Sequence, residues 1–111
     1  MVALATLDET KRRLNIDTSD FDQTIEGYIE AASASVVNYL KGQAKQLLQL
    51  DGNGEMPPDF VVPPAIVTAT IMLVGYWFRN PDADPDGDFE QGYLPKPVTA
   101  ILYPLRDPAL A

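Results

Sequence analysis

The sequence contains no cysteine and no histidine among its 111 residues. Without cysteine it can form neither a disulfide nor a thiolate metal site, so its stability must come from packing or from assembly with other chains. Without histidine it cannot use a histidine general base, a Ser-His-Asp triad or histidine metal ligands. The acidic residues that remain fall mostly in expected loops and first helical turns, where solvent keeps carboxylates ionised. We therefore expect no catalytic residue, no cofactor, no bound metal and no enzymatic activity.

Positive charge is also scarce, because 8 Lys and Arg stand against 16 Asp and Glu and give a net charge of −8. This balance disfavours binding to nucleic acid or to anionic lipid. The one basic cluster, Lys11-Arg12-Arg13, occupies consecutive positions, so its side chains fan out around a helix. We interpret the cluster as a solvated helix C-terminus that complements the helix dipole, in preference to a phosphate site.

Long apolar segments are missing as well. The longest nearly apolar run, Ala65 to Phe78, falls short of the roughly 20 residues of a membrane span. The first five residues lack the charged region of a secretory signal. We expect neither membrane insertion nor secretion, and the absence of cysteine suits a reducing cytoplasm.

What is present is typical of a folded globular chain, with 46% hydrophobic and 22% charged residues. Its length predicts one domain over residues 1–111. Thr6-Leu7-Asp8-Glu9 fits a capping box and predicts a short helix from Leu7 to about Leu14. A polar stretch follows, in which Ser19 is the expected next N-cap.

The clearest periodic signal begins at Phe21, where apolar residues recur every three or four positions as far as Leu40. This spacing predicts a long amphipathic helix. Gly42 either ends the helix or marks a kink in an extension to Leu50, because the apolar stripe continues through Ala44, Leu47 and Leu48. Small residues at Ala31 and Ala34 would let another backbone approach closely.

Two further helices are expected. Pro63-Pro64 opens a helix that continues from Ala65 to Arg79 with apolar residues on every side, so it must be covered all round, by its own chain or partly by neighbouring subunits. Val98 to Leu105 forms a short fourth helix. The only segment that resembles a strand is Phe60-Val61-Val62. The fold class is therefore all-α, a small bundle of about four helices with two long loops.

The loop from Asp82 to Gly92 contains half of a calcium-binding pattern. Asp82, Asp84, Asp86 and Gly87 match the first half of an EF-hand loop, but Tyr93 stands where the bidentate glutamate belongs. A solvated acidic loop is the favoured interpretation, and a calcium-responsive module that uses these three aspartates is the alternative.

The order of these segments resembles the small head–tail connector, or adaptor, proteins of long-tailed bacteriophages, over nearly the whole chain. The segments that carry the resemblance are Leu7-Asp8-Glu9, Leu14-Asn15-Ile16-Asp17, Asp20 and Asp22 before Ile25, Tyr28-Ile29, Ala31-Ala32, the run Ile71 to Asn80, and Leu94-Pro95 with Val98, Ala100, Leu102, Tyr103 and Arg106.

The resemblance implies a structural subunit of the virion neck, assembled in the host cytoplasm, that forms a ring, a dodecamer in the virion, between the portal protein and the tail-side neck or tail-completion proteins. It also implies a lumen through which DNA passes without sequence-specific binding, and no membrane partner. The candidate subunit-packing residues are Ile71, Val74, Gly75, Trp77, Phe78, Ala31 and Ala34, and the candidate portal-contacting, tail-contacting or lumen residues are Asp82, Asp84, Asp86 and Asp88. A generic helical adaptor outside phage assembly, which would stay monomeric or dimeric, is the second alternative.

Overall fold

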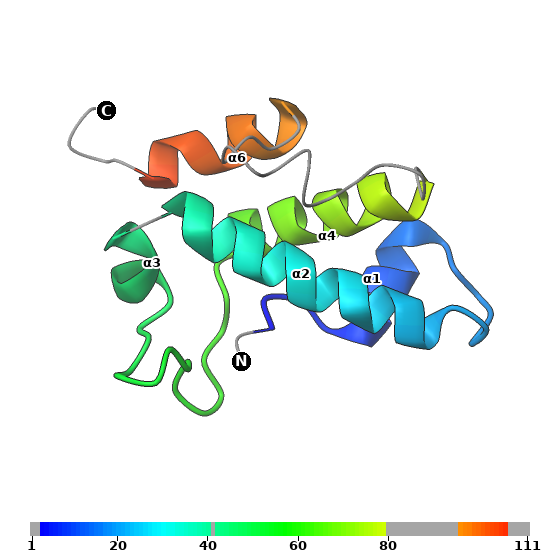
Figure 1. Ribbon diagram of the computed structural model, residues 1–111, viewed down its shortest axis with the longest axis horizontal. Helices are drawn as coiled ribbons and strands as arrows, with labels where there is room; N and C mark the ends of the chain where they lie inside the picture. Colours follow the sequence, from blue (N-terminus) through cyan, green and yellow to red (C-terminus); the bar gives the residue numbers. More distant parts are fainter. Residues whose placement is uncertain (1–2, 41, 80–95, 107–111) are drawn as a thin grey trace.

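The computed structural model describes residues 3–40, 42–79 and 96–106, and these residues form helices and no strand. The helices are α1 (Leu7–Leu14), α2 (Asp22–Leu40), α3 (Gly42–Leu47), α4 (Pro64–Arg79) and α6 (Lys96–Arg106). Helices α2 and α4 run antiparallel at the centre, α6 lies above them, and α1 and α3 lie at opposite ends of the long axis (Figure 1). The predicted all-α bundle is confirmed.

Helix α1 has the predicted bounds. The Thr6 hydroxyl accepts a hydrogen bond from the Glu9 amide at 3.1 Å, which is the first half of the capping box. The Glu9 carboxylate contacts Arg12 and Arg13 in place of the Thr6 amide. Asn15 ends the helix in the left-handed region, with φ of 60°, a conformation that asparagine tolerates at this position.

Helix α2 starts later than predicted, and Ser19 is not its N-cap. The hydroxyl of Thr18 accepts from the Asp20 amide at 3.1 Å, and the carbonyl of Ser19 accepts from the Asp22 amide at 3.2 Å. These bonds form a turn that delays the helix to Asp22. The predicted apolar face of α2 is confirmed, with buried residues at Ile25, Ile29, Ala32, Val36 and Leu40.

The stretch after α2 follows the kinked alternative only as far as Leu47, and the predicted extension to Leu50 is not helical beyond that residue. Helix α2 ends at Leu40, and α3 begins at Gly42 in a different direction (Figure 1). Ala44 and Leu48 are buried, so the apolar stripe of α2 continues across the kink.

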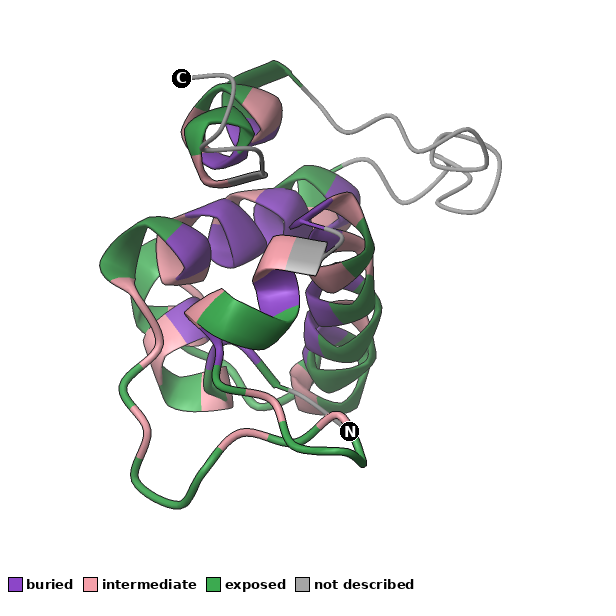
Figure 2. Cartoon of the chain, turned by 90° about the vertical axis from the view of Figure 1, so that its left-hand side faces the viewer, coloured by how far each residue is buried: buried purple, intermediate pink, exposed green. Residues whose placement is uncertain are grey.

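Helix α4 is covered by its own chain. It contacts α1, α2 and α6, and the interior between the helices is lined by buried segments while the outward surfaces are exposed (Figure 2). The buried residues of α4 are Ile66, Ala69, Thr70, Ile71, Leu73, Val74, Gly75 and Trp77. Each fully buried large apolar side chain contributes about 1.5–3 kcal/mol of transfer free energy. The all-round apolar character of α4 therefore reflects its central place in the bundle.

Helix α6 begins two residues before the predicted Val98. Pro97 lies in its first turn, where a missing amide hydrogen costs no intrahelical bond. Val98 and Leu102 are buried against the core. The segment Phe60–Val62 is irregular, and Val61 is 81% exposed.

Candidate functional site

Three candidate subunit-packing residues of α4 lie inside the chain's own core. Ile71 is 3% exposed, Val74 is fully buried and Trp77 is 2% exposed. The Trp77 ring packs against Tyr28 of α2 with ring centroids 6.0 Å apart. These side chains support an assembly by holding the bundle together, because α1, α2 and α6 already cover them.

The two other candidates on α4 lie where the bundle meets α1 and the turn before α2. A Cβ added at Gly75 would lie 2.9 Å from Cδ2 of Leu14, so the glycine lets α1 pack closely. Phe78 is half-buried and meets Phe21 edge to face, with centroids 5.4 Å apart. Since Phe21 is 45% exposed, this aromatic pair reaches the surface.

The candidates on α2 are exposed. Ala31, Ala34 and Gly27 lie on the side of α2 opposite its buried stripe, and the exposed Glu26 and Glu30 lie on the adjoining flank. We call these five residues the α2 outer face. A Cβ added at Gly27 would meet nothing within 4 Å. The structure therefore brings the small residues together on one accessible surface, where a second backbone could approach.

Sequence reasoning identified Ala31 and Ala34 but missed Gly27 and the two glutamates. The signal was available, because Glu26 and Glu30 are four positions apart, as are Gly27 and Ala31, and residues four apart share one face of a helix.

An open groove of about 460 Å³ borders this face. It is lined by Ala3, Ala5, Thr6, Leu7, Glu26, Ile29 and Glu30, so the N-terminal segment forms one wall and α2 the other. Leu4 fixes the wall. Its side chain is 1% exposed, and its amide donates to the buried Ser33 hydroxyl at 3.0 Å. The groove has an apolar floor and two carboxylates on its rim.

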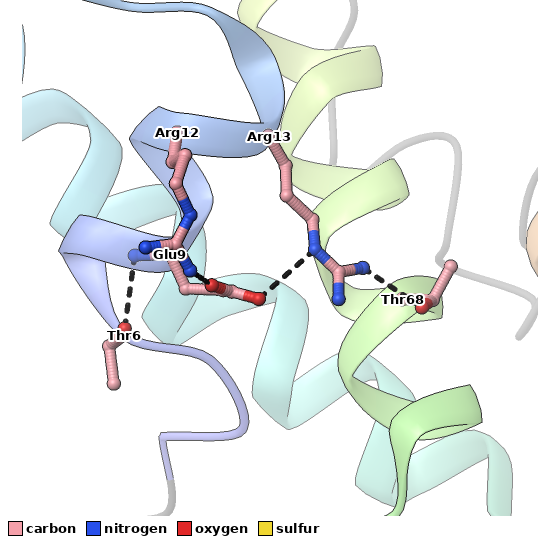
Figure 3. A network of polar contacts seen from close by, with 5 residues as sticks. All are labelled: Thr6, Glu9, Arg12, Arg13 and Thr68. Carbon is pink, nitrogen blue, oxygen red and sulfur yellow. Dashed lines mark hydrogen bonds and ion pairs between the residues drawn. The ribbon is translucent and has the colours of Figure 1, made fainter.

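The basic cluster of α1 is occupied by contacts within the chain (Figure 3). Arg12 and Arg13 both pair with Glu9, and Nη1 of Arg13 donates to the Thr68 hydroxyl at 3.0 Å. Lys11 pairs with Asp22 at 2.7 Å. The cluster therefore ties α1 to α4 and to the start of α2. The cluster lies in the last turn of α1 with Arg12 and Arg13 exposed, as the predicted solvated helix end requires, and its pairing leaves little positive charge for a phosphate.

The glycine-containing loop after α3 is a closed turn. Oδ1 of Asp51 accepts from the amides of Asn53 at 2.8 Å and Glu55 at 3.1 Å. These two backbone hydrogen bonds, that from Glu55 first, lower the pKa of Asp51 below its usual value of 3.8. Gly54 adopts a φ of 77°, which closes the turn. The amides point to Asp51, so this loop is no cradle for a phosphate.

The described residues offer surfaces for contact and few groups for chemistry. Within them, no three acidic side chains gather closely enough to hold a metal ion. The aspartates 82, 84, 86 and 88, and with them the half EF-hand pattern, lie outside the described residues. Among the helices that are described, none has the length and apolar character of a membrane span.

Together these features define a small all-α subunit whose outward features are a face of small residues, a groove and an acidic surface. A family model described as "Phage gp6-like head-tail connector protein" matches residues 4–106, from the buried Leu4 to the last residue of α6. The chain belongs to this family of phage head–tail connectors, as its sequence predicted. No curated protein and no solved structure gives a significant match.

Family membership carries a structural role in joining the head of a phage to its tail, in association with the virion and with other head and tail proteins. The family is one of structural connectors, which agrees with the expected lack of catalytic groups.

Proposed function

We propose that this protein forms a ring in the phage neck, between the portal of the filled head and the tail, and that the genome passes through its lumen. The observation that carries the proposal is the α2 outer face. In a chain that covers its apolar α4 with its own helices, this face keeps Gly27, Ala31 and Ala34 exposed on the longest helix. Small residues permit close helix packing between subunits, and a heterologous contact repeated by rotation closes into a ring.

Membership of the connector family supports the partners that we propose for the ring. One side meets the portal protein, and the other meets the tail-side neck or tail-completion proteins. Twelve subunits in the virion is the number that the connector family implies. Assembly takes place in the host cytoplasm.

The acidic balance supports passage of DNA. A net charge of −8 repels the phosphate backbone, and three of the described cations already pair with carboxylates in the same chain. The genome could therefore slide through the lumen without being held. A gel-shift assay with duplex DNA at low salt should show no binding by the assembled protein. Tight binding, or a lumen lined with basic side chains in an electron microscopy map, would contradict this part of the proposal.

The ring is tested first by native mass spectrometry and negative-stain microscopy, with and without the portal protein. We expect closed rings of uniform size. A protein that stays monomeric at high concentration, even with the portal protein present, would contradict the proposal.

The role of the α2 outer face is tested by Ala34→Arg. The side chain would point into open solvent in the free subunit, so the free energy of unfolding should change by less than about 0.5 kcal/mol, while ring formation should be lost. Ala100→Arg places the same substitution at an exposed alanine of α6 and should leave rings intact. Equal ring formation by both variants would move the contact away from α2.

A further inference from the structure

The groove beside α2 carries negative charge that no basic side chain of the described residues neutralises. Glu26 and Glu30 are both exposed, lie one helical turn apart on its rim, and form no ion pair with any described cation. Like charges at this spacing destabilise a helix. A positive group between the two carboxylates would remove that cost.

Few basic side chains are available to supply that charge. Lys11, Arg12 and Arg13 are paired within the chain, and Nε of Arg79 donates to the Gly75 carbonyl of its own helix. Among the described residues, the side chains of Lys45 and Lys96 form no hydrogen bond or ion pair. Lys45 is exposed in the last turn of α3.

The places of the groove and of Lys45 suit a head-to-tail contact. Helix α1, which follows the groove wall, and helix α3 lie at opposite ends of the molecule's 41 Å long axis (Figure 1). A heterologous contact joins two different surfaces of the same chain, which must lie apart on it. Lys96 fits less well, because it begins α6, which lies on the side of the bundle away from the N-terminal segment (Figure 1).

We propose that the groove formed by Ala3–Leu7 and α2 receives the α3 surface of a second copy, with Lys45 of that copy between Glu26 and Glu30. This inference rests on the proposed ring and names its contact. The aliphatic stem of the lysine lies on the floor made by Ala5 and Ile29, and its ammonium group meets the two carboxylates. The α2 outer face continues from the groove rim through Ala34 and adds close backbone contact.

The groove is built to keep its shape. Leu4 and Ser33 fix its N-terminal wall, and Ile29 in its floor is 5% exposed within the core. A volume of about 460 Å³ far exceeds the roughly 30 Å³ that one water molecule occupies in the liquid, so it can admit several side chains of a partner.

Charge reversal tests the contact directly. Glu26→Lys with Glu30→Lys changes the net charge from −8 to −4, because each reversal adds two charges. That change lowers the overall repulsion between copies and by itself would favour association. The proposed contact predicts the opposite, since two lysines would then face Lys45. We expect sedimentation velocity of the full chain, with the portal protein added where it is needed for assembly, to show at least about tenfold weaker association.

The matched control is Asp17→Lys with Asp20→Lys, which gives the same net charge at exposed acidic residues outside the groove. It should associate at least as well as the wild type. Lys45→Glu should also weaken association about tenfold, whereas Lys96→Glu, with the same net charge of −10, should weaken it less. Circular dichroism should show that all variants fold, because every substituted side chain is exposed.

Mixing the two defective proteins gives the sharpest result. If the two surfaces meet, a ring in which the two variants alternate has two kinds of interface. In the first, the lysines of the Glu26→Lys, Glu30→Lys groove face the carboxylate introduced by Lys45→Glu. In the second, an unchanged groove faces an unchanged Lys45. The equimolar mixture should therefore regain wild-type association to within a few fold.

The failures of the two proposals are distinguishable. Wild-type protein that never associates, even with the portal present, overturns the ring and this contact together. The contact alone is overturned if the wild type forms rings but the groove variant associates as well as its control. It is also overturned if the mixture of folded variants does not regain wild-type association.

Discussion

Helices α2 and α4 lie side by side and use their surfaces differently. Helix α4 buries half of its sixteen residues among α1, α2 and α6, and most of its partly exposed remainder lies along one stripe from Ala65 through Met72 to Arg79. Helix α2 buries one stripe and turns a second stripe of small and acidic residues to the outside. The more apolar helix thus holds the subunit together, and the less apolar one is available to a partner. Apolar content alone does not locate an interface, because a central helix needs it for folding.

The largest test of this contrast is Trp77→Ala. Truncating a buried tryptophan removes its transfer free energy and leaves a cavity, at a cost of about 3–5 kcal/mol. We expect urea denaturation followed by circular dichroism to show a severely destabilised subunit. Tyr76→Ala, at a neighbouring residue that is 37% exposed, should cost much less. A Trp77→Ala variant that stays as stable as the wild type but fails to assemble would place α4 at the interface after all.

A smaller loss is expected from Ser33→Ala, which tests whether the inner side of α2 fixes the N-terminal segment. The variant leaves the buried Leu4 amide without its acceptor, which costs about 1–3 kcal/mol. Hydrogen exchange at the Leu4 amide should speed up together with the fall in stability. Ser35→Ala, at a half-buried serine of the same helix, is the control and should change exchange at Leu4 little. Unchanged exchange at Leu4 in Ser33→Ala would mean that side-chain burial alone holds the segment.

The sequence predicted the two helices themselves but not their different roles. The period of the apolar residues predicted the buried stripe of α2 and the existence of α4, because both depend on local spacing. The division of roles could not be predicted. Whether Val74 and Trp77 meet their own chain or a neighbour depends on where α1, α2 and α6 pack, and that is a property of the whole bundle.

The same reason explains the smaller misses. Ser19 was a sound N-cap by residue type, but Thr18 forms the local bond and the turn delays α2 to Asp22. The groove could not be predicted from the sequence, because one wall comes from Ala3–Leu7 and the other from α2. The Leu4 to Ser33 hydrogen bond that joins the two walls links residues far apart in the sequence.

Two helical glycines, Gly27 and Gly75, give a matched pair at lower energy. Replacing an exposed helical glycine by alanine stabilises a protein by up to about 1 kcal/mol, and Gly27 on the α2 outer face has open space for the methyl group. At Gly75 on α4 the same methyl group would displace Leu14 and Arg79, each 2.9 Å away, and this displacement offsets the gain. Thermal unfolding of both variants should show a higher Tm for Gly27→Ala than for Gly75→Ala. Equal gains would show that α1 packs less tightly on α4 than these distances indicate.

The smallest effect on stability is expected from a substitution at Asp51, in the turn that leads from α3 toward α4. This substitution tests whether stability depends on the contacts of α4 more than on polar groups at the surface. The pKa of Asp51 is lowered by backbone hydrogen bonds from Glu55 and then Asn53. The ionised carboxylate therefore stabilises the folded chain at pH values above its usual pKa of 3.8. This contribution is lost as the pH falls through the lower pKa of the folded state. Asp51→Ala should be slightly less stable than the wild type in urea at about pH 6, and the difference should narrow at about pH 3. Asp17→Ala removes an exposed carboxylate that accepts no hydrogen bond from described residues and serves as the control. A loss at Asp51→Ala as large as that at Ser33→Ala would show that the turn, and not only the core around α4, fixes the path of the chain.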